Sequence, residues 1–122
     1  MRRIQKMVDV HALKMEKHLP SFYVEEIKNQ FLMWYEAENE CESLKEFCLS
    51  NHSCIYHFDK KEDIQMLVDY IDDVEYVEVE ENVAGQKYFR IGFMQDHHMS
   101  IIYFLEGTLP RRIERWLAKE SL

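Results

Sequence analysis

The 122-residue sequence has few of the residues that break regular structure, with three Gly and two Pro in all. This composition leaves little room for a flexible linker, so we expect one compact domain over residues 1–122. It also excludes the Gly-rich loops that cradle phosphates and the dinucleotide-binding fingerprint, and no Gly-x-Ser-x-Gly motif is present. A nucleotide-dependent enzyme of a common type is therefore not expected.

Long apolar runs are missing as well. The longest, Ile101 to Leu105, is far shorter than the ~20 residues that a membrane-spanning helix needs. Charged residues interrupt Met1 to Leu19, where a signal peptide would carry its apolar core. The sequence has three cysteines, an odd number. We expect a protein of the reducing cytoplasm that does not associate with a membrane.

Basic residues are absent from Glu62 to Glu81, a segment that holds nine of the 23 acidic residues in a chain of formal net charge −8. This charge distribution argues against nucleic-acid binding, which depends on Lys and Arg to neutralise phosphates. Two interpretations of the acidic segment stay open. It is either a solvated face that maintains solubility or a surface that meets a basic protein partner.

Three runs rich in Val, Ile, Tyr and Phe between Val74 and Leu105 predict a three-stranded antiparallel meander. Its hairpin loops fall at the polar residues 81–86 and 95–98. The first run alternates Val with Glu, which is typical of an edge strand or of an open sheet face, whereas the third is apolar on both sides. We therefore expect the third strand to be central, with residues 54–58 as a candidate fourth strand beside it.

Apolar residues at helical spacing predict helices in the rest of the chain. The predicted helices cover residues 3–18, a segment beginning at Ser21, residues 43–49, a segment beginning at Asp59 and a segment beginning at Thr108. The order α-α-α-β-α-β-β-β-α corresponds to an α+β domain in which a mostly antiparallel sheet packs against helices.

The second predicted helix is apolar over more of its circumference than one packing partner requires. Phe22, Leu32 and Met33 fall outside its broad apolar face. Either the helix is sandwiched inside the domain, or these three side chains belong to an exposed contact surface.

Five residues of the kinds that bind zinc occur close together in the middle of the chain: Cys41, Cys48, His52, Cys54 and His57. Structural zinc sites usually present ligand pairs two to four residues apart on turns. Here Cys54 and His57 fall in a predicted strand, where residues three apart face opposite sides. We interpret the five as buried structural cysteines and ordinary histidines, and we assign no metal or cofactor, although a zinc site stays an alternative.

Two further groups of histidines have plain structural interpretations. Asp96-His97-His98 lies at a predicted hairpin tip. Adjacent side chains of an extended chain point apart, so we interpret it as a solvated turn, and a functional use in metal binding, proton transfer or partner contact stays an alternative. His11 lies in the apolar stripe of the first predicted helix, and we interpret it as a core histidine.

These observations favour a non-catalytic protein–protein interaction or regulatory module with an acidic surface and a basic protein as partner. The candidate partner surface comprises Asp72, Asp73, Glu75, Glu78, Glu80, Glu81, Phe22, Leu32 and Met33. The alternative is a small-ligand-binding or enzymatic pocket between the sheet and the helices. Its candidate lining residues are His11, Tyr35, His57 and Arg90.

Overall fold

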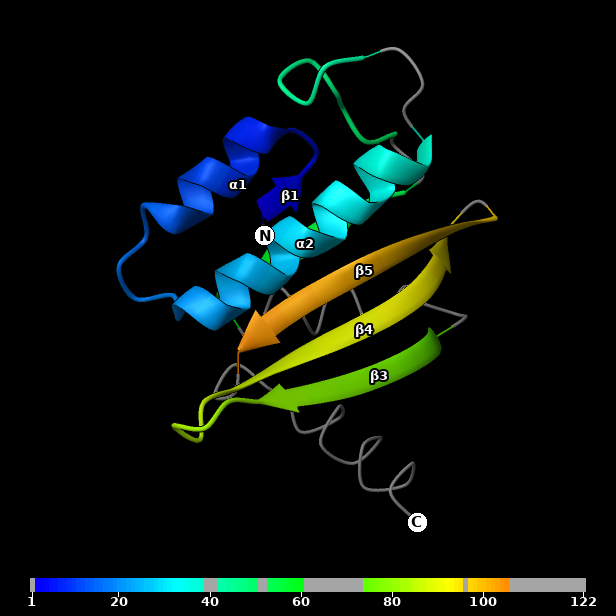
Figure 1. Cartoon of the computed structure of the whole chain (residues 1–122). Coiled ribbons are helices and arrows are strands. Elements are labelled where there is room, and N and C mark those ends of the chain that lie inside the picture. Colours follow the sequence, from blue (N-terminus) through cyan, green and yellow to red (C-terminus); the bar gives the residue numbers. More distant parts are fainter. Residues whose placement is uncertain (1, 39–41, 51–52, 61–73, 96, 106–122) are drawn as a thin grey trace.

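The computed structural model describes residues 2–38, 42–50, 53–60, 74–95 and 97–105 (Figure 1). Its elements are β1 (Arg2–Ile4), α1 (Met7–Lys14), α2 (Ser21–Glu38), β2 (Ile55–Phe58), β3 (Val74–Glu81), β4 (Lys87–Gln95) and β5 (His98–Leu105). The chain therefore has mixed α+β content, as predicted. None of the described helices is both long enough and apolar enough to cross a membrane.

The five described strands form one sheet in the order β1-β2-β5-β4-β3. β2 and β5 are parallel, and the other neighbours are antiparallel. The predicted meander β3-β4-β5 is confirmed, as are the central position of β5 and its pairing with β2. The sheet is larger than expected, because β1 adds a fifth strand beside β2.

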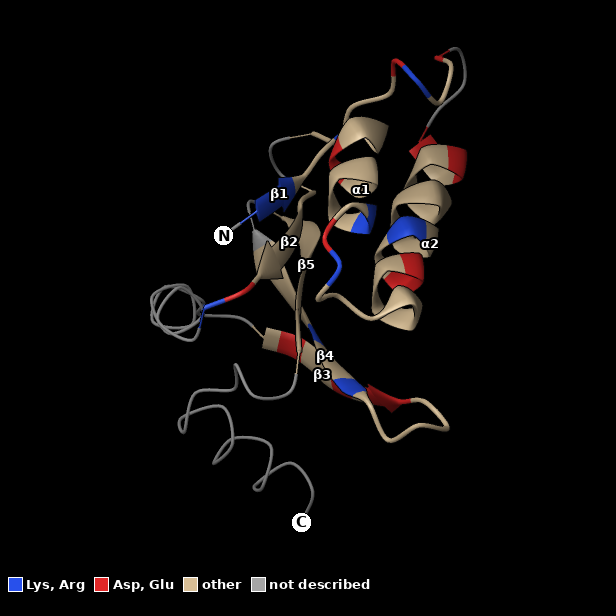
Figure 2. Ribbon diagram, turned by 90° about the vertical axis from the view of Figure 1, so that its left-hand side faces the viewer, with Lys and Arg blue, Asp and Glu red and all other residues tan. Residues whose placement is uncertain are grey.

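Both described helices cover the same face of the sheet (Figure 2). Side chains alternate between the two faces of a strand, and both faces here carry a buried apolar cluster. The cluster beneath the helices includes Leu13, Tyr23, Ile27, Phe31, Ile55, Tyr88, Ile101 and Tyr103. The cluster on the opposite face includes Cys54, Tyr56, Phe58, Phe89, Ile91, Phe93, Ile102 and Phe104. The central strand β5 contributes to both clusters, which explains its continuous apolar run.

The prediction of one helix over residues 3–18 is wrong at its start. The chain begins with β1, and α1 starts only at Met7. The carboxylate of Asp9 accepts hydrogen bonds from the backbone N–H groups of Gln5 and Lys6, each at 2.9 Å. These bonds fix the transition from strand to helix at this point.

The residues that α1 buries also differ from the predicted stripe. Val10 and Leu13 are fully buried, whereas Met15 is 81% exposed and His11 is exposed. The prediction failed because Ile4, which begins the stripe, belongs to β1. A strand of three residues is too short to reveal its alternation in the sequence.

The helix predicted over residues 43–49 is a turn followed by extended chain. Phe47 and Leu49 are buried, whereas Cys48 between them is exposed, as in an extended chain. The N–H group of Leu49 donates to the carbonyl of Gln5 at 2.8 Å, and Cys48 forms a bridge with Lys6. Pairing with the segment before α1 therefore replaces the helical hydrogen bonds. The bodies of the helices predicted after Asp59 and Thr108 lie outside the described residues.

Candidate functional site

A row of five side chains crosses the sheet beneath the helices, one from each strand. The strand registers align Arg2, His57, Tyr103, Arg90 and Glu78. Neighbouring strands lie about 4.8 Å apart, so the row is roughly 19 Å long. Arg2, His57, Arg90 and Glu78 carry or can gain a charge near neutral pH, and Tyr103 carries a phenol. The row is therefore a polar line across the face that holds the apolar cluster beneath the helices.

His57, second in this row, has a side chain that is 0% exposed. Its Nδ1 atom lies 2.5 Å from the hydroxyl of Tyr23 on α2, and its Nε2 atom lies 2.8 Å from Oδ1 of Asp59, just after β2. Burial lowers the pKa of His57, although the Asp59 carboxylate acts in the opposite direction. Burial also raises the pKa of Tyr23 well above its usual value.

The lowered pKa of His57 favours a neutral imidazole, and this assigns the hydrogen bonds of its two ring nitrogens. The neutral imidazole donates its Nε2–H to Asp59, because an ionised carboxylate can only accept. Its Nδ1 atom then accepts from the Tyr23 hydroxyl. The order of phenol, imidazole and carboxylate is that of a proton relay. Tyr23 and His57 are 0% and 1% exposed, however, so the phenol is closed to a substrate in this conformation.

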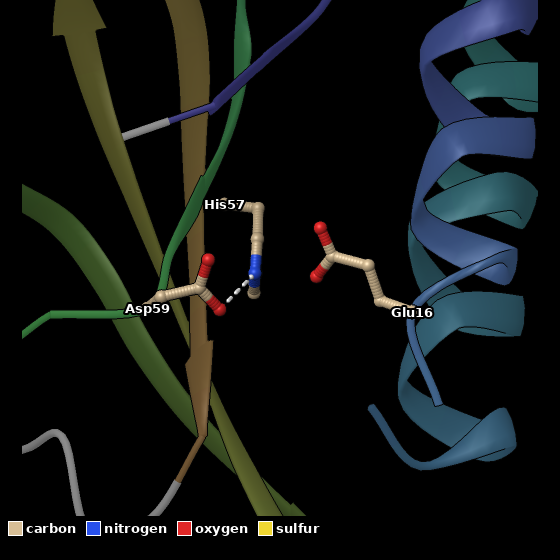
Figure 3. A group of neighbouring side chains, drawn as sticks. All are labelled: Glu16, His57 and Asp59. Carbon is tan, nitrogen blue, oxygen red and sulfur yellow. Dashed lines mark hydrogen bonds and ion pairs between the residues drawn. The ribbon is translucent and has the colours of Figure 1, made fainter. Parts of the chain in front are cut away.

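Glu16 and His18 reach the same place from the connection between α1 and α2. Figure 3 shows the Glu16 carboxylate directed toward His57 and Asp59. The Nε2 atom of His18 lies 3.5 Å from Asp59 Oδ1 and 3.7 Å from Glu16 Oε2. Donor atoms of Glu16, His57 and Asp59 all lie within 4.8 Å of one another. We call Glu16, His18, His57 and Asp59 the His57 cluster.

The two oxygens of Glu16 have different surroundings. Oε1 pairs with the guanidinium of Arg2. Oε2 is buried, and within the described part of the chain it has no hydrogen-bond partner. Its contact with His18 Nε2, at 3.7 Å, is too long for a hydrogen bond, so among the described residues this oxygen lacks the hydrogen bond that burial normally demands.

Little in the sequence signals this cluster. From the sequence, His57 is a candidate zinc ligand and a candidate pocket residue, and Glu16 and His18 fall at the end of a predicted helix. His18 and Asp59 are 41 residues apart in the chain. The one local signal is the spacing of His57 and Asp59, which lie two residues apart around the end of β2.

Arg90, farther along the row, pairs with carboxylates from both layers. Its Nη1 atom lies 2.6 Å from Oε1 of Glu26 on α2. Its Nη2 atom pairs with Glu78 on β3 and lies 3.9 Å from Glu80. The Arg90 side chain is only 16% exposed, whereas the Glu78 and Glu80 side chains are 46% and 53% exposed, so the network is shielded from water mainly at the guanidinium and at Glu26. It joins α2 to the outer strand of the sheet.

The predicted acidic surface lies mainly along β3. Glu75, Glu78, Glu80 and Glu81 are exposed, and Figure 2 marks the acidic residues of this strand in red. Among the described strands, β3 pairs with β4 alone and forms the outer edge of the sheet. The remaining two acidic residues of the prediction, Asp72 and Asp73, lie outside the described residues.

The three apolar candidates on α2 have different surroundings. The Phe22 ring is half-buried, with its centroid 5.3 Å from that of Tyr88. Leu32 is also half-buried and packs against the core beneath the helices. Met33 alone of the three is well exposed, at 62%. The structure therefore assigns Phe22 and Leu32 to packing and leaves Met33 on the surface.

The cysteines and histidines of the suggested zinc cluster do not converge where they are described. Cys48 is exposed, and Cys54 is buried in the apolar cluster on the sheet face away from the helices. His57 faces the helices instead. Cys41 and His52 lie outside the described residues.

Asp96 also lies outside the described residues. In the same hairpin, His97 occupies the left-handed region with a φ of 67°, and His98 is the exposed first residue of β5. His97 is exposed as well. This agrees with a tight polar turn.

The four residues suggested as lining a pocket lie in separate places. His11 lines an open surface groove on α1 together with Met7, Val8 and Leu44. The Tyr35 hydroxyl donates to the carbonyl of Glu42 at 3.0 Å. His57 is held by Tyr23 and Asp59, and Arg90 by three glutamates.

Comparisons of the chain with protein-family models, with curated proteins and with solved structures gave no match. Its function is therefore argued from its own residues.

Proposed function

We propose that this chain is a non-catalytic protein-binding module that binds a basic segment of a partner protein along β3. The observation that carries the proposal is the position of β3, an acidic and exposed strand at the outer edge of the described sheet.

An edge strand offers backbone donors and acceptors on the side where it has no neighbouring strand. An extended segment of another protein can pair with that side, so that main-chain hydrogen bonds supply affinity and alternate side chains supply specificity. β3 has eight residues, and after a register irregularity between Val74 and Tyr76 its remaining part, up to Glu81, provides a regular row of such groups. Val79 is 46% exposed between acidic neighbours and gives a bound segment an apolar contact.

The charge of β3 selects the kind of partner. Arg90 offsets part of the charge of Glu78 and Glu80. Glu75 and Glu81 lie near the two ends of the strand, outside this network, and both are exposed. A basic segment would complement this edge, and electrostatic attraction of this kind mainly speeds association and weakens as salt increases.

The enzymatic alternative has less support from the described residues. Its suggested lining residues lie apart, and the Tyr23–His57–Asp59 relay is closed at the phenol. A protein-binding edge strand does not require these side chains to lie close together.

The experiment is affinity capture from the native host with the tagged full-length chain and two charge-reversal variants. Glu75→Lys/Glu81→Lys reverses charge at both ends of β3, and Glu36→Lys/Glu38→Lys reverses two exposed charges at the end of α2 as a matched control. A protein retained by the wild type and by the control, lost from the β3 variant and released by salt supports the proposal. A captured protein retained equally by both variants, or the absence of any captured protein even at low salt, contradicts it.

A further inference from the structure

We propose that the His57 cluster, Glu16, His18, His57 and Asp59, is a binding site for a divalent transition-metal ion, with Zn²⁺ the ion that its donors fit best. This inference is independent of the partner surface on β3. It uses other residues at the opposite end of the polar row.

The donor atoms have the right chemistry for zinc. Imidazole nitrogens and carboxylate oxygens are both common zinc ligands, and four of them complete the tetrahedral set of a structural site. The cluster supplies two of each kind. Calcium and magnesium prefer sites made of oxygen alone, so the two imidazoles favour a transition metal.

The donor atoms are also close to the right distances. Zinc bonds of 2.0–2.1 Å in a tetrahedron place neighbouring ligand atoms about 3.3–3.4 Å apart. In the structure, Asp59 Oδ1 lies 2.8 Å from His57 Nε2 and 3.5 Å from His18 Nε2. His18 Nε2 lies 3.7 Å from Glu16 Oε2. These three separations lie on both sides of the tetrahedral value. The donor atoms of Glu16, His57 and Asp59 all lie within 4.8 Å of one another, whereas the exposed His18 side chain would have to move toward His57 to complete the set.

A separate observation concerns Glu16, the inner carboxylate of the cluster. Glu16 Oε2 is buried and has no hydrogen-bond partner among the described residues. Burial of an unsatisfied carboxylate oxygen is costly. A cation between Glu16 and His57 would satisfy this oxygen, while Oε1 keeps its ion pair with Arg2.

Tyr23 orients the buried ligand. Metal-binding histidines usually bond through their second ring nitrogen to a fixed partner, which sets the direction of the ring. The Tyr23 hydroxyl, 2.5 Å from His57 Nδ1, is such a partner. The neutral imidazole carries one proton, so on metal binding through Nε2 that proton would move to Nδ1 and be donated there to the Tyr23 oxygen.

The site has a path from solvent. The side chains of His18 and Asp59 are 64% and 41% exposed, while His57 and Glu16 form the inner wall. With four protein ligands the ion would have a structural role. It would tie the connection between α1 and α2 to the end of β2.

The test is calorimetric titration of the metal-free full-length chain with ZnCl₂, in wild type, Glu16→Gln and His18→Gln. We expect the wild type to bind one Zn²⁺ per chain. Each variant should lose affinity by at least ~10-fold, because even residues that only hydrogen-bond to a metal ligand have effects of this size. Both side chains lie in a surface connection, so circular dichroism should show that these variants still fold. His11→Gln, an exposed histidine outside the cluster, is the matched control and should bind zinc as the wild type does.

Two further measurements test the site. The first tests the role of Tyr23, and the second shows whether a cysteine binds the ion. Tyr23→Phe should weaken zinc binding by about 10-fold without removing any ligand. Co²⁺ bound in place of Zn²⁺ should give visible bands without the near-ultraviolet absorption of a cobalt–thiolate bond. Absence of zinc binding at micromolar concentrations, binding unchanged by Glu16→Gln and His18→Gln, or a thiolate band with Co²⁺ would overturn the proposal.

Discussion

The Tyr23 hydroxyl and the Nδ1 atom of His57 lie 2.5 Å apart, which joins α2 to β2 at a point where both side chains are buried. The two residues are 34 positions apart in the sequence. Their contact fixes the helix layer over the end of the polar row where the His57 cluster lies. The ion pairs of Arg90 with Glu26 and Glu78 fix the same helix over the other end.

Removing the Tyr23 hydroxyl should destabilise the fold. Tyr23→Phe leaves the buried Nδ1 of His57 without its partner, and we expect the free energy of unfolding to fall by about 1–3 kcal/mol. Urea denaturation of metal-free protein measures the change. Tyr35→Phe is the matched control, since it removes an exposed hydrogen bond to the carbonyl of Glu42 and should cost less. Equal losses in the two variants would contradict the account.

The Arg90 network should show energetic coupling between the layers. Arg90→Met and Glu26→Gln each remove one partner of a shielded ion pair, 2.6 Å between its charged atoms. In a double-mutant cycle we expect a coupling free energy of roughly 0.5–3 kcal/mol, as is typical of contacting residues in one network. Additive losses would show that the pair does not tie α2 to β4.

Gly92 on β4 should be intolerant of a larger residue. A Cβ atom at this position would overlap the ring of Tyr76, which lies against it on β3. Gly92→Ala should lower the free energy of unfolding by about 1–3 kcal/mol, the usual cost of overpacking. The same substitution in a Tyr76→Ala background should cost much less. A loss of the same size in both backgrounds would rule out this clash as the cause.

Alkaline pH should destabilise the fold through Tyr88. Burial, reinforced by the nearby Glu26 carboxylate, raises the pKa of Tyr88 from 10.0 to about 12. A folded-state pKa above the unfolded value means that this contribution to stability is complete below pH 10.0 and is lost as pH rises toward 12. Thermal unfolding between pH 8 and about pH 11 should therefore lose stability less steeply in Tyr88→Phe than in the wild type. Identical slopes would contradict the assignment.

The sequence predicted the parts of the fold that depend on local patterns. The meander β3-β4-β5 and the central position of β5 follow from alternation, burial on both sides and two short polar loops. β1 was missed because its three residues show no period, and only pairing with β2, more than fifty positions away, makes it a strand. The helix predicted over residues 43–49 does not form, because Cys48 and Leu49 pair with Lys6 and Gln5, just after β1.

The two candidate sites also differ in how far the sequence predicts them. The acidic residues of β3 lie close together in the sequence and alternate with Val. This local pattern is enough to predict an exposed strand. The His57 cluster joins the connection between α1 and α2 to the end of β2, and no spacing within either segment signals it. Only the folded arrangement brings Glu16 and His18 to His57 and Asp59.

The most direct test of the proposed function is amide hydrogen exchange of the chain with and without its captured partner. If the partner pairs along the edge of the sheet, the amides of β3 should exchange more slowly in the complex, while those on the exposed face of α2 should be unchanged. Protection confined to α2 or to the groove beside His11, with β3 unaffected, would contradict the proposal.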